Sequence, residues 1–206
     1  MRHGSKTAAV VALAAALSLA DASQAWAWGY CAALGHAALT GRLRIDPAAV
    51  EEAAKLLYIR ALKLLPDDIK QGFARLDAGE TDGTAKTVLA TMVRNIAVAE
   101  ARDNLLCQDT GIPIYNVTIG RSVDVDGAAL KDAIRRGVER ATREHPLRSS
   151  VVHPITRQNE QTSCGALVPV INIDFSDRVA ELRLEMIPKG SGSENGSFLK
   201  MAIPAE

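Results

Sequence analysis

The densest group of reactive side chains in this sequence surrounds one cysteine, in the run Cys107-Gln108-Asp109-Thr110-Gly111. A cysteine thiolate can bind iron, and a carboxylate two residues later can accept or donate a proton. Glutamine and threonine side chains can hydrogen-bond the carboxylate group of a substrate. The same residues are also typical of a plain turn. Taken alone, they leave both interpretations open.

A second candidate is the glycine- and serine-rich run KGSGSEN at 189–195. Consecutive small residues can expose backbone N–H groups that bind an anion such as a carboxylate or a phosphate. The spacing fits neither a P-loop nor a dinucleotide fingerprint, and a flexible turn is the alternative. Arg148 is a third candidate, because a guanidinium can hold a carboxylate through two hydrogen bonds. A single arginine in a loop is, however, more often only exposed.

Charge and cysteine content argue against several other classes of function. Lys and Arg total 24 and Asp and Glu total 24, so no net charge draws the chain toward nucleic acid or an anionic membrane. The arginines between residues 135 and 143 are interspersed with glutamates, which indicates a solvated helix face. Three cysteines, Cys31, Cys107 and Cys164, are too few and too widely spaced for a disulfide scaffold. No CxxC pair indicates structural zinc.

Four stretches have the apolar spacing of helices that would position these residues. The first begins at Asp46-Pro47 and stops before Pro66, where a shorter helix starts. The third runs from about Thr84 to Arg102, and the fourth covers 127–144. The side chains expected to face inward are Val88, Met92, Ile96 and Ala99 of the third helix and Leu130, Ile134, Val138 and Ala141 of the fourth.

Three strands are expected beside these helices, which predicts a mixed α/β (α+β) fold. The residues after Cys107 lead from a turn into a strand rich in β-branched residues that ends at Gly120. The stretch ALVPVINIDF at 166–175 is apolar enough for a central strand. A hairpin turn at 176–178 should join it to a strand whose apolar and charged residues alternate from 180 to 186. The stretch 145–163 has little periodicity, and so long a loop is usually functional or disordered.

The first residues have the parts of a secretory signal. A basic start is followed by an apolar run, 8–20, that is too short to span a bilayer, and Ala25-Trp26-Ala27 forms a cleavage site. An alanine-rich helix packed on the domain is the alternative. Neither interpretation provides a stable membrane anchor.

Several stretches, taken in order, resemble class I fumarate hydratases and L(+)-tartrate dehydratases. They are the LPDD preface, LLCQDTGIPIYNVTIG, ERATREHPLR, VVHPITRQN and IPKGSGSEN. The resemblance covers about 45–206 and divides the chain into a signal-like leader at 1–44 and a partial iron–sulfur hydro-lyase alpha-type catalytic domain at 45–206. It implies N-terminal helices followed by the mixed strands and helices of that domain.

The resemblance also implies a chemistry, which is the reversible hydration of fumarate to malate with a [4Fe–4S] cluster. The alternatives are an L-tartrate dehydratase alpha subunit and a truncated, non-catalytic remnant. Cys107 would bind the cluster, and Asp109 would transfer a proton. Substrate contacts would come from Gln108, Thr110, Arg148 and Gly190.

Other parts of the family pattern differ in this sequence. The family's two further cluster cysteines fall downstream of the glycine-serine loop. Cys31 lies in the leader, and Cys164 lies in NEQTSCG, where relatives usually have a different arrangement. The family's site also needs a beta-type subunit or domain. We therefore expect this chain to form part of an enzyme that acts on a small dicarboxylate, and to belong to a homo- or hetero-oligomer. The family function favours the cytoplasm, whereas the leader favours export.

Overall fold

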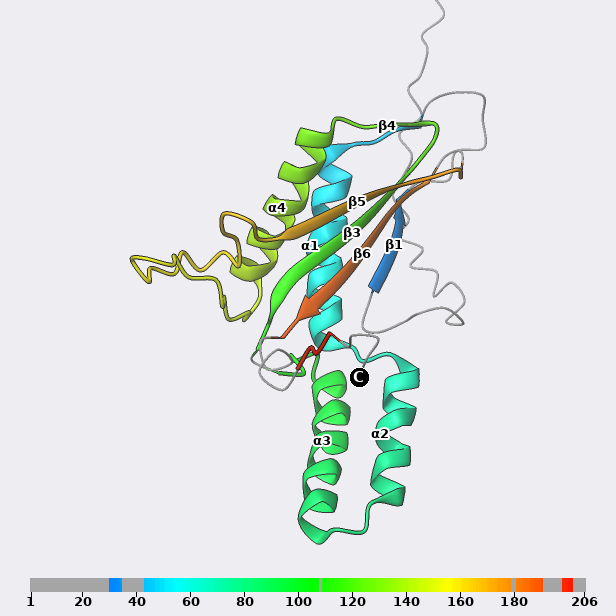
Figure 1. Ribbon diagram of the computed structural model, residues 1–206, viewed down its shortest axis with the longest axis vertical. Coiled ribbons are helices and arrows are strands. Elements are labelled where there is room, and N and C mark those ends of the chain that lie inside the picture. The colour runs from blue at the N-terminus through cyan, green and yellow to red at the C-terminus, as the bar shows by residue number, and fades with distance from the viewer. Residues whose placement is uncertain (1–29, 35–42, 108, 179–180, 191–197, 202–206) are drawn as a thin grey trace, which may run out of the picture.

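The computed structural model describes residues 30–34, 43–107, 109–178, 181–190 and 198–201, and for 30–34 only the course of the backbone. In these ranges the chain forms ten elements in a mixed α/β arrangement, as the sequence predicted (Figure 1). They are β1 (Tyr30–Leu34), β2 (Leu43–Arg44), α1 (Pro47–Lys63), α2 (Asp67–Gly79), α3 (Gly83–Ala101), β3 (Ile112–Gly120), β4 (Val123–Asp124), α4 (Gly127–Glu144), β5 (Val170–Ser176) and β6 (Leu182–Lys189).

The main sheet has the strand order β1-β6-β3-β5. Strand β6 is antiparallel to both of its neighbours, and β5 is parallel to β3. The short strands β2 and β4 pair in parallel beside the main sheet. Strands β1 and β2 come from the region before Ile45, so this region contributes backbone pairing to the fold.

Helices α1 and α4 pack side by side on one face of the main sheet (Figure 1). Asp46 caps α1 by accepting a hydrogen bond from the Ala48 N–H, and the proline at the first helical position needs no such partner. In α4, the residues predicted to share a face are all at most 1% exposed. The core also includes Val50, Leu57, Tyr58, Tyr115, Val117, Leu182, Leu184 and Met186, which are at most 2% exposed. The helical spacing of α4 and the alternation along β6 therefore predicted their buried residues correctly.

The arginines of α4 form a charged outer edge with α1. Arg136 Nε lies 2.7 Å from Glu51 Oε2, and Arg140 lies 3.0 Å from the other oxygen of the same carboxylate. The hydrogen bond from Arg136, reinforced by Arg140, lowers the pKa of Glu51. The interspersed charges thus join the two helices on their solvent side.

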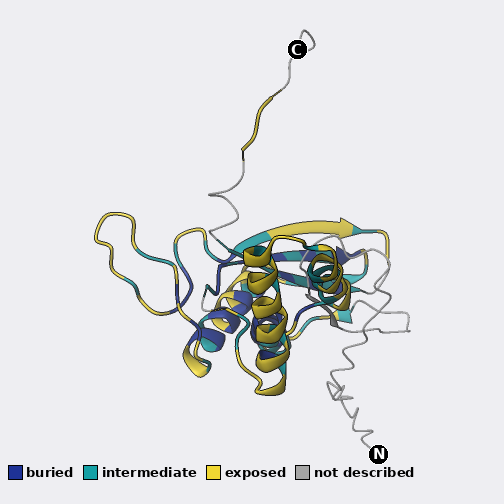
Figure 2. Ribbon diagram, turned by 90° about the horizontal axis from the view of Figure 1, so that it is seen from below, coloured by how far each residue is buried: buried dark blue, intermediate teal, exposed yellow. Residues whose placement is uncertain are grey.

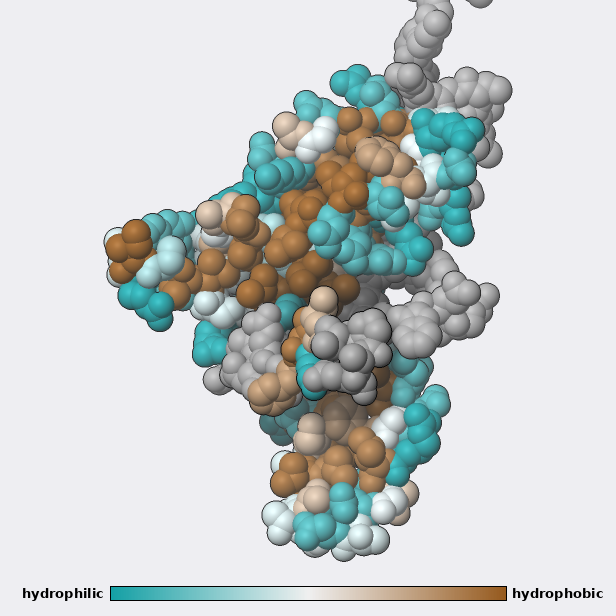
Figure 3. Space-filling model, viewed as in Figure 1, coloured by the Kyte–Doolittle hydropathy of each residue, from teal (hydrophilic) through white to brown (hydrophobic). Residues whose placement is uncertain are grey.

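Helices α2 and α3 form a pair that projects beyond the sheet and is largely exposed (Figures 1 and 2). The predicted inward face of α3 is wrong in part, because Val88 is 54% exposed and Met92 is 43% exposed, whereas Ala99 is buried. The apolar spacing is present and α2 packs against α3, but this packing leaves Val88 and Met92 largely in solvent. Figure 3 shows apolar side chains on this lower lobe. No helix in the described ranges is long and apolar enough to cross a membrane.

Val138 in the buried helix α4 and Val88 in the exposed helix α3 allow the difference in burial between the two helices to be measured. Val138→Thr should lower the free energy of unfolding by about 1.5 kcal/mol, because it places a hydroxyl at a fully enclosed position. Val88→Thr should change it by less than about 0.5 kcal/mol, since the exposed site keeps the hydroxyl in water. Urea unfolding of both variants checks the pair, and equal losses would contradict the placement of α3.

The sheet differs from prediction at its edge. Strand β5 was expected to be central but is the outermost strand beside β3, and Ile173 and Phe175 are 48% and 77% exposed. The predicted hairpin at 176–178 is also wrong, because β3 lies between β5 and β6. An apolar run indicates that a strand will be covered, but it does not identify the chain that covers it.

Candidate active site

The predicted reactive residues meet at the end of the sheet where β3 begins. Residues 107–111 connect α3 to β3, and the Leu106 N–H donates to the Leu62 carbonyl at the end of α1 with an N–O distance of 2.9 Å. From α3, the Asn95 side-chain amide donates to the Leu106 carbonyl at 2.8 Å. The segment before Cys107 is thus fixed to two helices.

Local hydrogen bonds shape the turn that carries Cys107 and Asp109. The Asp109 N–H donates to Cys107 Sγ at 3.5 Å, and the Gly111 N–H donates to Asp109 Oδ1 at 3.2 Å. Cys107 is exposed, while Asp109 is partly buried. Gln108 lies outside the described residues. The backbone at Asp109 and Gly111 is thus held by the side chains of Cys107 and Asp109.

Two glycines let the turn approach the end of β6 closely. Gly111 has φ +68°, and a Cβ at this position would lie 2.7 Å from the Lys189 carbonyl oxygen. A Cβ at Gly190 would lie 3.4 Å from Asp109 Oδ2. The register explains this approach, because Ile112, next to Gly111, pairs with Lys189. Residues 191–197 of the glycine-serine run lie outside the described residues.

Arg148 reaches the same place from the loop that follows α4. One of its terminal guanidinium nitrogens lies 3.9 Å from Asp109 Oδ1. The Arg148 side chain is 62% exposed and that of Asp109 is 32% exposed, so this ion pair contributes little to stability. The pair matters because it places the Arg148 guanidinium, which can donate two parallel hydrogen bonds, beside the Asp109 carboxylate on an accessible surface.

Thr110 lies beneath this surface, fully buried. Its hydroxyl donates a short hydrogen bond to the Arg148 carbonyl, and its own carbonyl accepts one from the Tyr58 hydroxyl at 3.3 Å. Burial raises the pKa of Tyr58, opposed by hydrogen bonds with Ser163 and Thr110. The phenol is therefore neutral at ordinary pH and acts as a donor.

The buried Cys164 is not part of this group. Cys164 is 6% exposed, its thiol donates to the Arg135 carbonyl at 3.7 Å, and burial raises its pKa to about 12. A thiol held protonated in this way does not suit metal ligation. The side chain of Cys31 lies outside the described residues. Among the described side chains, no group of three or more His, Cys, Asp or Glu could hold a metal ion. Of the two described thiols, Cys107 is exposed and Cys164 is buried.

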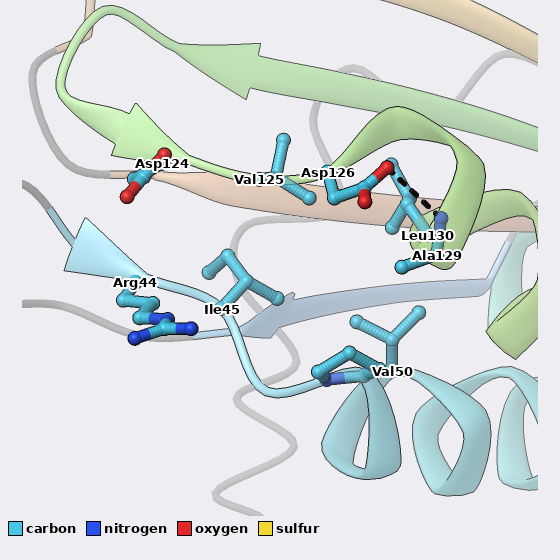
Figure 4. A pocket seen from close by; sticks show the side chains of 9 residues that line it. Arg44, Ile45, Val50, Asp124, Val125, Asp126, Ala129 and Leu130 are labelled. Atoms are coloured by element: carbon cyan, nitrogen blue, oxygen red, sulfur yellow. Dashed lines mark hydrogen bonds between the residues drawn. The ribbon is translucent and has the colours of Figure 1, made fainter.

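A hollow of about 340 Å³ lies elsewhere, where α1 and α4 begin (Figure 4). Arg44, Asp124 and Asp126 line its polar part, and Ile45, Val50 and Leu130 contribute apolar side chains. The Asp126 carboxylate already caps α4 by accepting from the Ala129 N–H at 3.2 Å. This hollow lies near the strand β4, beyond the far end of β3, and contains none of the predicted reactive residues.

Comparison with known families shows where this chain belongs. Residues 51–206 match the family described as "Fumarate hydratase (Fumerase)". This chain belongs to the fumarate hydratase family. Within that family, it is 38% identical over 152 residues to the "Putative L(+)-tartrate dehydratase subunit alpha" of Methanocaldococcus jannaschii, covering 73% of this chain and 53% of that protein.

Two more family members show the breadth of the similarity. The "Putative fumarate hydratase class I" of Geobacillus stearothermophilus is 27% identical, over 75% of this chain and 30% of that protein. The L(+)-tartrate dehydratase subunit alpha of Escherichia coli strain K12 is 28% identical, over 69% of this chain and 46% of that protein. This fumarate hydratase family chain thus spans about half, or less, of the length of these relatives.

Sequence reasoning missed the residues that support the site from behind. Tyr58 holds the Thr110 carbonyl, Ser150 donates to the Gly111 carbonyl at 3.3 Å, and the Asn159 amide donates to the Ser149 carbonyl at 2.9 Å. Tyr58 lies in an apolar helix face like any core residue, and no local spacing distinguishes it. The contacts of Tyr58 and Ser150 join segments that are far apart in this sequence, so only the folded chain reveals them.

Proposed function

We propose that this chain supplies part of the active site of an iron–sulfur hydro-lyase that acts on a small dicarboxylate. The observation that supports the proposal is the meeting of Cys107, Asp109, Arg148 and Gly190 at one end of the sheet. These residues come from three separate segments of the chain. A simple turn would not require Arg148 and Gly190, from two other segments, to lie beside Asp109.

Cys107 is the proposed ligand of a [4Fe–4S] cluster. The cluster would supply an open iron that acts as a Lewis acid toward the substrate. The Cys107 thiol is exposed, and its sulfur accepts a hydrogen bond from the Asp109 N–H, so the sulfur is both accessible and held in place. The remaining length of the relatives is the proposed source of the other ligands. A cytoplasmic location would suit such a cluster.

The other residues have proposed roles that follow from their geometry. The Arg148 guanidinium would bind a substrate carboxylate through two hydrogen bonds. Asp109 would hold or move a proton at Oδ2, because its Oδ1 already accepts from the Gly111 N–H. Gly190 leaves space against that carboxylate, where a larger residue would intrude. Gln108, from the family resemblance, would make a further substrate contact.

We propose L(+)-tartrate as the substrate in preference to fumarate. The family resemblance had implied fumarate hydration first, with L-tartrate dehydration as an alternative. Among the relatives described above, however, the one of highest identity is named as a tartrate dehydratase alpha subunit. The same name supports a beta-type subunit as the partner of this chain. The fumarate hydratase class I relative is less similar, at 27% identity.

A chimera tests this proposal because the chain matches about half of its relatives. Residues 51–201 would replace the matched segment of the Methanocaldococcus jannaschii subunit, and a beta-type subunit would be co-expressed. After anaerobic reconstitution with iron and sulfide, we expect the visible absorbance and EPR signal of a cluster, together with greater kcat/KM for L(+)-tartrate than for fumarate. Cys107→Ser should remove the cluster.

The matched control is Cys164→Ser, which changes a buried thiol and should leave the cluster in place. A full cluster in the Cys107→Ser chimera would show that Cys107 is not a ligand. An intact cluster with no turnover of either dicarboxylate would refute the hydro-lyase assignment. Faster turnover of fumarate would reverse the proposed order of substrates.

A further inference from the structure

The backbone around Arg148 is tied to the Cys107 turn by two hydroxyl groups. Thr110 donates from its Oγ1 to the Arg148 carbonyl, and Ser150 donates back to the Gly111 carbonyl at 3.3 Å. The two bonds connect Thr110 and Gly111 with the segment 148–150. The relative position of Asp109 and Arg148 is therefore set by these two crossing bonds.

Thr110 is itself anchored to the core. Its carbonyl accepts a hydrogen bond from the Tyr58 hydroxyl on α1, and both residues are fully buried. The segment at 148–150 has a further contact, in which the Ser163 N–H donates a hydrogen bond to Ser149 Oγ at 3.0 Å. Thr110 thus lies between a rigid helix and the loop that carries Arg148.

The burial of Thr110 bears on what its hydroxyl can do. Its side chain has no exposed surface, and its oxygen donates to a backbone carbonyl. The family resemblance suggests a direct substrate contact, but this geometry favours an indirect one. The accessible groups above it are the Arg148 guanidinium and the Asp109 carboxylate, 3.9 Å apart.

We propose that Thr110 is a positioning residue, whose hydroxyl fixes the Arg148 backbone so that the guanidinium stands over Asp109. The proposal rests on the proposed function, in which Arg148 binds a substrate carboxylate. The hydroxyl acts through its hydrogen bond and not through its volume. Thr110→Val removes the bond with little change of shape, whereas Thr110→Ser keeps the bond.

The test uses the full chain and NMR spectroscopy. The reporter is amide hydrogen exchange at Ser163, because its N–H is held by Ser149, the residue next to Arg148. Thr110→Val should speed this exchange about fivefold to tenfold, the factor that corresponds to one hydrogen bond. Thr110→Ser should restore the wild-type rate within about twofold. The control is Thr142→Val, which removes another buried hydroxyl that donates to the Val138 carbonyl inside α4.

A second readout follows the Arg148 side-chain Nε–H signal during titration with L(+)-tartrate or fumarate. Thr110→Val should weaken either response about fivefold or more, and Thr110→Ser should recover it. If neither dicarboxylate shifts the wild-type signal while Ser163 exchange still accelerates, the positioning role stands and the proposed substrate site fails. If Thr110→Val leaves Ser163 exchange unchanged, or if Thr142→Val accelerates it equally, the positioning role is overturned.

If Thr110→Val does not fold, a second pair of variants still tests the proposal. Thr110→Ser and Thr110→Ala are both smaller than threonine and differ from each other only by the hydroxyl. The same two readouts on this pair make the comparison with no added bulk. Equal behaviour of the serine and alanine variants would overturn the proposal.

Discussion

Replacing Gly111 with alanine should lower the free energy of unfolding by about 3 kcal/mol. Part of this loss, about 1–2 kcal/mol, comes from placing a side chain at φ +68°, which L-residues other than glycine rarely adopt. The rest comes from collision, because the new Cβ would lie 2.7 Å from the Lys189 carbonyl oxygen and 2.8 Å from the carbonyl carbon. Both atoms belong to the backbone of β6, which its neighbouring strands hold in place.

Urea unfolding measures this loss, and Gly190→Ala is its matched control. Gly190→Ala also adds one methyl group where the Cys107 segment meets the end of β6. The nearest atom to this methyl group would be Asp109 Oδ2, at 3.4 Å. We expect this second change to cost less than about 1 kcal/mol, because the distance is an ordinary contact and no left-handed backbone is involved. A Gly111→Ala variant as stable as Gly190→Ala would contradict the close approach of the turn to β6.

Gly137→Ala should lower the free energy of unfolding by about 2 kcal/mol, although alanine favours helices. A Cβ at Gly137 would lie 2.5 Å from the Glu51 carbonyl oxygen and 2.8 Å from Ala54 Cβ. These atoms lie on α1, so the methyl group can be accommodated only if α1 and α4 move apart. Such a movement would open the core between them.

Thermal or urea unfolding beside a Gly72→Ala variant tests this sign. Gly72 lies in the exposed helix α2, and the nearest atom to its added Cβ would be the end of the Arg75 side chain at 3.9 Å. That variant should gain about 0.5–1 kcal/mol from helix propensity alone. Two stabilised variants would show that α1 and α4 are not in close contact at Gly137.

The local sequence predicted the elements well and their surroundings less well. The apolar spacing of α4 identified its buried face because amphipathic helices bury one stripe whatever covers it. The same reasoning failed for Val88 on α3, since periodicity defines an apolar side but not the chain that covers it. Strand β5 failed for a related reason, because the position of a strand within a sheet depends on pairing with distant segments.

The candidate site likewise could be predicted in its residues but not in how they come together. The residues around Cys107, the glycine-serine run that includes Gly190 and Arg148 could all be selected from their types, and the family resemblance assigned them roles. Their meeting depends on the register between β3 and β6 and on the hydroxyl of Thr110. Neither is encoded in short-range spacing. Tyr58, which holds Thr110 from α1, is indistinguishable in sequence from a packing residue.

The place of β6 in the sheet has a consequence for how the protein matures on the ribosome. This strand, Leu182–Lys189, lies between β1 and β3 and covers α1 with apolar side chains, yet it is translated last of the three. While synthesis proceeds, α1 and β3 have emerged without the strand that completes their shared core. Contacts between such distant segments form slowly, and the waiting apolar surface is prone to aggregation. The main sheet can therefore be completed only after β6 has left the ribosome, and until then chaperones that bind apolar segments have the largest exposed surface to bind.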